Sequence, residues 1–265
     1  MEREDDKYER YSSVVLSTAA LGSVGKMIRF EHVTRTYGNR VAVDDLNLVV
    51  SPGELLALLG HNGAGKTTTL KMLVGLLTPN SGSVQVGPFD VVQHPREASR
   101  LIGYVPDQPF LYDKLSGREF LFFVAEMYGL TSTEVQECVA RETERFKLSD
   151  FLDQLSESYS HGMRQRTVFA AALLHQPELL IVDEPMVGLD PQSIRLVKDL
   201  LRSYANSGKT VLMSTHTLAI AEEIADRVAV MKDGKLLFEG DVKTLREELL
   251  GAELSLEELY LKLME

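Results

Sequence analysis

The stretch GHNGAGKT at residues 60–67 constrains this chain more than any other feature. It matches Gly-x4-Gly-Lys-Ser/Thr and lies between the apolar run ELLALLG and a segment with apolar residues at helical spacing. Glycines let backbone N–H groups curl around phosphate oxygens, and the helix adds the positive end of its dipole. A Gly-rich turn without a ligand is the alternative, but it needs neither the lysine nor the hydroxyl. The motif therefore predicts that Lys66 reaches nucleotide phosphates and that Thr67 ligates Mg²⁺.

A second motif, ELLIVDEP at residues 178–185, places two carboxylates after four apolar residues of an expected strand. Adjacent acids are also common at solvated strand ends, so this motif alone leaves both readings open. Together with Lys66 it predicts nucleotide hydrolysis. Asp183 is then expected in the Mg²⁺ shell, and Glu184 is expected to polarise the attacking water.

The order of apolar patterns predicts the fold class. Strand and helix patterns alternate, which is typical of a parallel α/β sheet, and RVAVM and KLLFEG, joined by KDG, predict a closing hairpin. Helical patterns fill residues 116–176, two of them opening with capping boxes at Ser116 with Glu119 and Thr131 with Glu134. We expect an α/β P-loop NTPase fold with a mainly parallel sheet core, an antiparallel β subdomain and an inserted helical subdomain at about 110–176.

The two ends of the chain receive separate predictions. Residues 1–26 form either a disordered N-terminal arm or a mis-assigned start, because organised patterning begins directly after Met27. The nucleotide-binding domain is expected over residues 27–262. Its last element is the amphipathic helix SLEELYLKL, with a capping box at Ser255 and Glu258.

Composition excludes several classes of protein. The net charge of -11 argues against a sequence-independent nucleic-acid binder, which needs clustered Lys and Arg. The single Cys138 lies in a helical pattern and predicts a buried, inert thiol. No stretch approaches the roughly 20 apolar residues of a membrane span, and the acidic start is unlike a secretory signal.

Four segments together carry a family resemblance. GHNGAGKTTTL, YSHGMRQR, LLIVDEPMVGLDP and MSTH, in that order, resemble the ATP-binding subunit of an ABC transporter over about residues 28–262. The resemblance implies ATP and Mg²⁺ as ligands and a separate polytopic membrane permease as partner. It also implies a location at the cytoplasmic face of the membrane. The segments LTPNSG through GYVPD and the C-terminal tail are similar to the drug and polysaccharide exporter subfamily.

The resemblance also assigns roles to individual residues. Tyr37 matches the aromatic residue that stacks on adenine, and His216 matches the histidine that contacts the γ-phosphate. Asp107 stands where the family commonly has Gln, with Gln108 one residue later, and the sequence leaves open which of them faces the nucleotide. The expected catalytic residues are Lys66, Glu184 and His216, and the expected metal ligands are Thr67 and Asp183. The expected nucleotide-binding residues are Tyr37, Gly60, His61, Asn62, Gly63, Ala64, Gly65, Lys66, Thr67, Thr68, Asp107, Gln108, Ser160, Gly162 and Asp190.

The segment YSHGMRQR replaces the usual LSGGQ pattern of the family. In the family this segment begins a helix whose N-terminus grips the γ-phosphate of ATP held by the other subunit. Ser160 and Gly162 therefore imply a head-to-tail homodimer or heterodimer around two ATP molecules, in which Asp190 contacts the partner's phosphate loop. His161 is interpreted as a tolerated replacement for glycine, with a mild pH dependence as a further hypothesis.

Two further alternatives stay open. An ABC ATPase that drives assembly or signalling instead of transport would carry the same motifs. The run Phe120 to Val124 is apolar on every side of its expected helix, so it must be covered. Either it is core, or part of it docks the permease.

Overall fold

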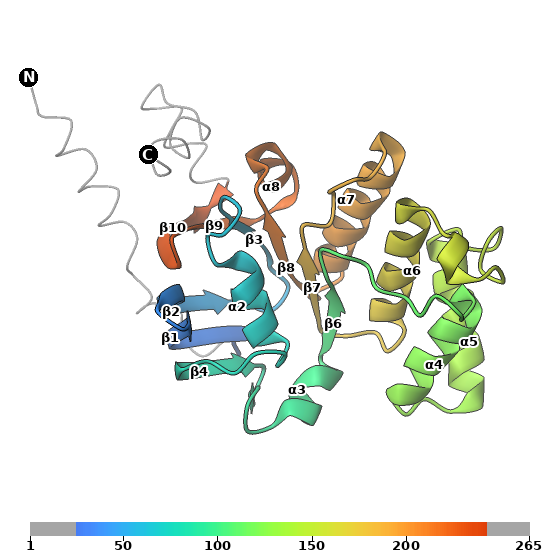
Figure 1. Ribbon diagram of the computed structural model, residues 1–265, viewed down its shortest axis with the longest axis horizontal. Coiled ribbons are helices and arrows are strands. Elements are labelled where there is room, and N and C mark those ends of the chain that lie inside the picture. The colour runs from blue at the N-terminus through green and yellow to red at the C-terminus, as the bar shows by residue number, and fades with distance from the viewer. Residues whose placement is uncertain (1–24, 243–265) are drawn as a thin grey trace, which may run out of the picture.

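The computed structural model describes residues 25–242, which form two sheets and a group of helices (Figure 1). The central sheet has six strands in the order β10-β9-β3-β8-β7-β6, parallel except for the antiparallel pair β9 and β10. Its strands are β3 (Leu55–Leu59), β6 (Ile102–Val105), β7 (Leu179–Asp183), β8 (Thr210–Thr215), β9 (Arg227–Lys232) and β10 (Lys235–Asp241). The predicted α/β class with a mainly parallel sheet is confirmed.

An antiparallel sheet of order β2-β1-β4-β5 lies to one side, as predicted. It consists of β1 (Ile28–Tyr37), β2 (Arg40–Val50), β4 (Ser81–Val86) and β5 (Phe89–Asp90). The helices are α2 (Lys66–Leu73), α3 (Pro95–Arg100), α4 (Gly117–Met127), α5 (Ser132–Arg145), α6 (His161–Leu173), α7 (Pro191–Asn206) and α8 (Leu218–Ile224). Helices α4, α5 and α6 lie together at the end of the molecule opposite the antiparallel sheet (Figure 1).

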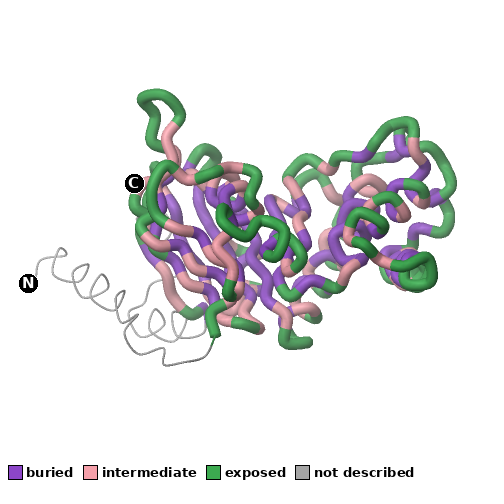
Figure 2. Tube along the Cα trace, turned by 90° about the horizontal axis from the view of Figure 1, so that it is seen from below, coloured by how far each residue is buried: buried purple, intermediate pink, exposed green. Residues whose placement is uncertain are grey.

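The central sheet is covered on both faces, which explains the unbroken apolar run of β3. Leu55, Ala57 and Leu59 belong to the core shared with the helices α4 to α8, whereas Leu56 and Leu58 belong to the core shared with α2 and the antiparallel sheet. All five side chains are fully buried. Figure 2 shows buried residues running through the strands and exposed residues in the connections.

Both capping boxes of the helical region are present. The Ser116 side chain accepts from the Glu119 amide while Glu119 accepts from the Ser116 amide, and Thr131 and Glu134 do the same at α5. Cys138 is a free, buried thiol on α5, and burial raises its pKa. The prediction of an inert, buried cysteine therefore agrees with its position.

Two local predictions were incomplete. The helical spacing of Leu70, Leu73, Val74 and Leu77 favours a helix that continues to Leu77. Helix α2 instead ends at Leu73, because Gly75 takes φ 77° and closes it. The Gly75 amide donates to Met72 O and the Leu76 amide to Lys71 O, which is a Schellman termination. The short elements β5 and α3 were not predicted, since neither is long enough to show a periodic pattern.

Two predictions fall wholly or largely on residues that the structure does not describe. The helix expected over 255–263 lies outside the described residues, as do residues 1–24 of the expected N-terminal arm. Within residues 25–242, no helix combines the length and apolar character needed to cross a membrane.

Candidate nucleotide site

The loop between β3 and α2 requires glycine at two positions. A Cβ at Gly60 would lie 2.5 Å from Met231 O, and a Cβ at Gly65 would lie 2.6 Å from Ala42 O. Gly65 also takes φ 109°, a conformation that side chains rarely adopt. The hairpin of β9 and β10 contacts the same loop, since the Gly234 amide donates to Ala64 O at 3.0 Å. The loop is thus held between β2 and this hairpin.

Lys66, the first residue of α2, extends back across the loop. Its Nζ donates to Gly60 O at 2.7 Å and to His61 O at 3.3 Å, and the side chain is only 5% exposed. Nζ also forms an ion pair at 3.2 Å with Glu184 Oε1, without hydrogen-bond geometry. A largely buried ammonium group in this position is a strong point charge for a phosphate.

Asp183 ends β7 and is completely buried. One carboxylate oxygen accepts from the Ser214 hydroxyl, whereas Oδ2 has no hydrogen-bond partner. Burial raises the pKa of this carboxyl, and hydrogen bonds from the Ser214 and Thr67 hydroxyls oppose the rise. A buried carboxylate oxygen without a donor gains free energy from a nearby cation.

Glu184 follows directly and adopts φ 47°, in the left-handed region that few non-glycine residues occupy. Its amide donates to Ser214 Oγ at 3.0 Å, which fixes the turn after β7. The carboxylate is 16% exposed and lies between two partners: Lys66 on one oxygen and His216 Nδ1, at 2.9 Å, on the other. This carboxylate is positioned to accept a proton from a molecule in the adjoining pocket.

Lys66 and Glu184 border a pocket of about 410 Å³. Asp107 lines it, whereas Gln108 is exposed and is not among the lining residues. The lining residues are Tyr37, Arg40, Ala42, His61, Asn62, Gly63, Gly65, Lys66, Thr67, Thr68, Asp107 and Glu184. The structure therefore brings most of the expected nucleotide-binding residues to one place.

Arg40 is a pocket residue that the sequence reasoning missed. It begins β2 opposite Tyr37, and its Nη2 would lie 3.5 Å from a Cβ at Gly63. Among the described residues its guanidinium group has neither a hydrogen bond nor an ion pair. The only signal in the sequence was a cation three positions after the expected adenine-stacking Tyr37, close enough to share its hairpin.

Besides Gln108, several predicted residues do not line this pocket. Gly60, Ala64, Asp183 and His216 lie next to lining residues or contact them, whereas Ser160, Gly162 and Asp190 belong to other helix N-termini. Ser160 is the N-cap of α6, where its Oγ accepts from the Met163 amide at 3.3 Å, and Gly162 lies in the first turn. Asp190 is the N-cap of α7 and accepts from the Gln192 and Ser193 amides, both at 3.0 Å. Ser160 and Asp190 are exposed. The pocket of Lys66 is thus formed without them.

The residues present fit a magnesium ion. Asp183 offers an unpartnered buried oxygen, and Thr67 offers a hydroxyl beside it. Mg²⁺ usually takes one or two protein ligands and completes its shell with phosphate oxygens and water. In residues 25–242, no group of three or more His, Cys, Asp or Glu side chains could hold a metal ion without such help.

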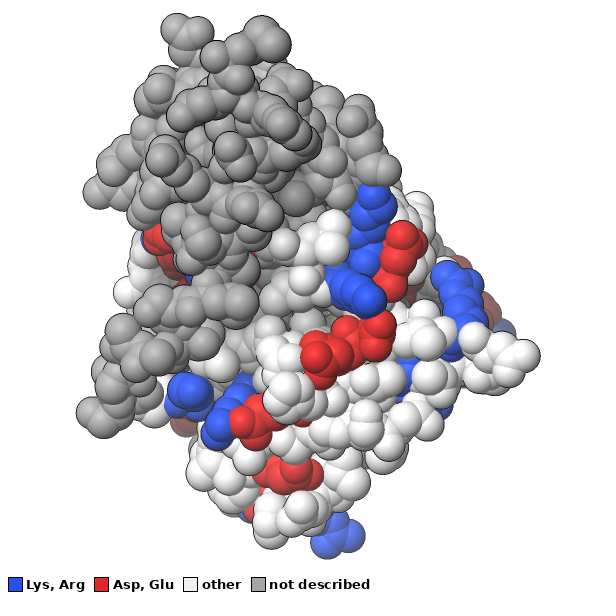
Figure 3. Space-filling view, turned by 90° about the vertical axis from the view of Figure 1, so that its left-hand side faces the viewer, with Lys and Arg blue, Asp and Glu red and all other residues white. Residues whose placement is uncertain are grey.

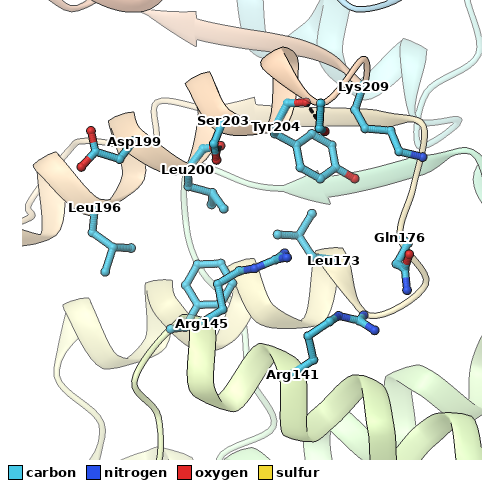
Figure 4. Close-up of a pocket in the computed structure, with 12 residues that line it drawn as sticks. Arg141, Arg145, Leu173, Gln176, Leu196, Asp199, Leu200, Ser203, Tyr204 and Lys209 are labelled. Atoms are coloured by element: carbon cyan, nitrogen blue, oxygen red, sulfur yellow. Dashed lines mark hydrogen bonds between the residues drawn. The ribbon is translucent and has the colours of Figure 1, made fainter.

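Two larger clefts hold none of the motif residues. One, of about 580 Å³, lies between α5 and α7, with Arg141 and Arg145 on one wall and Asp199 and Tyr204 on the other (Figure 4). Both arginines form ion pairs with the buried Glu142, which therefore compensates one of their two positive charges. The other, of about 740 Å³, lies between the antiparallel sheet and β10. Figure 3 shows acidic and basic side chains interspersed on that side of the molecule.

Comparison with known proteins identifies the family. The family model described as ABC transporter matches residues 43–187. The ABC transporter ATP-binding protein YhaQ of Bacillus subtilis is 37% identical over 220 residues, covering 83% of this chain and 73% of that protein. The Nod factor export ATP-binding protein I of Burkholderia thailandensis is 38% identical over 226 residues, covering 85% and 74%. The linearmycin resistance ATP-binding protein LnrL of Bacillus subtilis is 35% identical over 225 residues, covering 85% and 72%.

Solved structures agree with the sequence relatives. An ATP-binding subunit of an ABC transporter superposes with a TM-score of 0.82 at 32% identity, covering 89% of this chain and 99% of that one. A dimeric ATP-binding cassette in a post-hydrolysis state, bound to ADP and Pi, superposes with a TM-score of 0.76 at 25% identity, covering 82% and 99%. With the family match and the phosphate-binding pocket, these similarities show that the chain belongs to the ABC transporter family, as an ATP-binding subunit that hydrolyses ATP.

Proposed function

We propose that this chain works as a head-to-tail dimer that encloses two ATP molecules and drives a separate membrane permease, as an exporter. The observation that carries the proposal is the separation of two phosphate-binding features. Lys66 and Glu184 border one pocket, whereas the N-terminus of α6 at Ser160 is exposed and lies outside it. A helix N-terminus with a serine cap is suited to an anion, and a second copy can supply that anion as bound ATP.

Within each site we assign roles from the geometry. Lys66 binds the β- and γ-phosphates, Tyr37 stacks on the adenine, and the loop glycines present their amides to phosphate oxygens. Glu184 accepts the proton of the attacking water, and His216 holds that carboxylate through its 2.9 Å contact. Asp183 and Thr67 would hold Mg²⁺, which when bound neutralises charge on the β- and γ-phosphate oxygens.

An apolar groove of about 320 Å³ is our candidate for permease docking. Leu76 and Phe110, exposed by 64% and 67%, line it together with Tyr104 and Val124. The apolar run on α4 is divided: Phe120 and Leu121 are buried, whereas Phe123 is 42% exposed. The run is therefore partly core and partly available to a partner.

Tyr104 connects the groove with the nucleotide site. It lines the groove, and its hydroxyl is buried without a hydrogen-bond partner. Burial, together with the nearby charges of Asp183 and Asp107, raises the pKa of this tyrosine. A partner that occupies the groove would thus lie against a side chain close to the proposed Mg²⁺ ligand.

The remaining parts of the proposal rest on the relatives. Two of the similar proteins carry names for Nod factor export and linearmycin resistance, which favours the exporter direction. A further structural neighbour is part of an ABC transporter complex from Clostridium perfringens, which favours a peripheral place on a permease at the cytoplasmic membrane face. We propose residues 27–262 as the ATP-binding domain and about 110–176 as its helical subdomain. The proposed dimer contains either two identical or two different ATP-binding subunits. We propose no nucleic acid as a partner.

Replacing Glu184 with Gln tests the dimer and the base together. The variant keeps the phosphate-binding residues but cannot accept the proton, so we expect hydrolysis to slow by roughly 10² to 10⁴. ATP should then shift the variant to a dimer in size-exclusion chromatography. Glu178→Gln is the matched control, because Glu178 lies just before the same strand and is paired with Lys209. A Glu184→Gln variant that binds ATP and stays monomeric would contradict the proposal.

A further inference from the structure

His161 forms a contact between two segments that are distant in the sequence. It is the first residue of α6, and its Nε2 lies 3.2 Å from the carbonyl oxygen of Val187. Because the acceptor is a carbonyl, Nε2 carries the proton and donates. The side chain therefore links the beginning of α6 to the loop between β7 and α7.

Gly188 allows the imidazole ring to approach this loop closely. Gly188 has φ 73°, and a Cβ there would lie 3.3 Å from two ring atoms of His161, Cδ2 and Nε2. The ring thus packs on the backbone at Gly188 in addition to donating to Val187. A glycine at position 161 could make neither contact, so the interpretation of His161 as a merely tolerated replacement leaves this geometry unexplained.

The two segments joined by His161 both lead to a side chain that caps the N-terminus of a helix. Ser160 precedes His161 and caps α6, while Asp190 follows the contacted loop and caps α7. Both caps are exposed, and neither lines the pocket of Lys66. In the dimer proposed above, on which this inference rests, both segments face the nucleotide held by the neighbouring copy.

We propose that His161 is a positioning residue that holds the N-terminus of α6 and the loop 187–190 in one arrangement, so that both reach the neighbouring copy's nucleotide together. Two exposed segments that move independently lose conformational freedom when the dimer closes. A side-chain hydrogen bond that already fixes their relative position lowers that cost. The effect belongs to dimer closure and hydrolysis, whereas ATP binding to the chain's own pocket does not involve it.

The test compares His161→Ala with His161→Gln. Gln places an amide donor near the position of Nε2, whereas Ala removes both donor and ring. We expect His161→Ala to lower kcat, and to weaken the ATP-dependent dimer in the Glu184→Gln background, by about three- to tenfold, the effect of one hydrogen bond. His161→Gln should restore most of both. The Kd of the monomer for ATP, measured with a fluorescent ATP analogue at low protein concentration, should stay within twofold.

His32→Ala is the control, because His32 is an exposed histidine on β1 whose ring contacts Asp45. The inference is overturned if His161→Ala hydrolyses ATP and dimerises like the unchanged chain or better, if Gln fails to restore the loss, or if the monomer's ATP affinity falls in parallel. Failure of the dimer proposal itself would give a different result. The Glu184→Gln chain with an intact His161 would then show no ATP-dependent dimer at all.

Discussion

At the scale of single residues, the nucleotide site depends on one strained backbone position. Glu184 occupies the left-handed region at φ 47°, a conformation that costs on the order of 1–3 kcal/mol and persists only where the surrounding structure enforces it. Hydrogen bonds from the Glu184 amide to Ser214 enforce it here. The Glu184 carboxylate of this turn lies between Lys66 and His216.

Arg40 leads to a prediction about nucleotide affinity. Its guanidinium lines the pocket near Gly63 and has no partner among the described residues, so it is available to a phosphate. We expect Arg40→Gln to weaken ATP binding by about three- to tenfold. The loss should be smaller at high salt, because salt screens the attraction between an exposed arginine and a phosphate. Titration of ATP at two ionic strengths measures both effects.

Arg96→Gln is the matched control for this prediction, since Arg96 is an exposed arginine on α3 outside the pocket. Equal ATP affinities of the Arg40 variant and the control would show that Arg40 does not contact the nucleotide. A loss of affinity that does not depend on salt would show that the effect is not electrostatic.

The site was predictable from the sequence where its residues are contiguous. The phosphate-binding residues of the loop from Gly60 to Thr67 are consecutive in the sequence. Asp183 and Glu184 are adjacent and follow an apolar strand directly. Arg40 and the contact of His161 could not be predicted in the same way. Their partners are set by how strands and helices pack, and the partner of His161 is a backbone carbonyl, which any residue type provides.

At the scale of elements, His175 joins three parts of the fold. It follows α6, stacks on Tyr128 at the end of α4 with ring centroids 3.7 Å apart, and contacts Ile102 O on β6 at 3.1 Å through Nε2. Its Nδ1 is buried without a partner. Protonation would place a charge at that buried nitrogen, and burial accordingly lowers the pKa of His175 to about 4.

This pKa predicts a pH dependence of stability. Below the unfolded value of about 6.5 the unfolded chain binds a proton that the folded chain does not take up until about 4, so stability falls as the pH drops through this window. His175→Phe keeps a stacking ring but cannot bind a proton. We expect it to be less stable than the unchanged chain at pH 7, through the lost hydrogen bond, and the difference to narrow by about 1–2 kcal/mol at pH 5.

Urea unfolding at pH 7 and pH 5 measures this difference, and His94→Phe is a control because His94 is exposed. A stability difference that stays constant between the two pH values would contradict a neutral, buried His175.

His175 also illustrates a contact that sequence patterns do not predict. Helices α4 and α5 were predictable from their capping boxes, whereas the stack between α4 and the end of α6 depends on the fold as a whole.

At the scale of the whole molecule, an apolar groove remains open beside the two apolar cores of residues 25–242. The central sheet separates the cores, and the groove lies where α4 and α6 approach α2 and β6. Leu76 is exposed there because the Schellman turn at Gly75 ends α2 early and directs the chain outward. The same irregularity that shortened the predicted helix therefore supplies an exposed apolar side chain at the rim of the groove.

Leu76→Glu tests whether this groove binds the permease. A charge buried against an apolar partner surface should weaken the complex at least tenfold, whereas the variant's own ATPase rate should stay within about twofold, because Leu76 does not line the nucleotide pocket. Copurification from membranes in which the full chain is coexpressed with a candidate permease encoded beside its gene measures the first quantity. Leu237→Glu, which changes an exposed leucine on β10, is the control for added charge. If both variants copurify with the permease as the unchanged chain does, the docking surface is elsewhere. If Leu76→Glu alone loses the permease and keeps its ATPase rate, the groove is a docking surface for the permease that is separate from the chemistry of the nucleotide pocket.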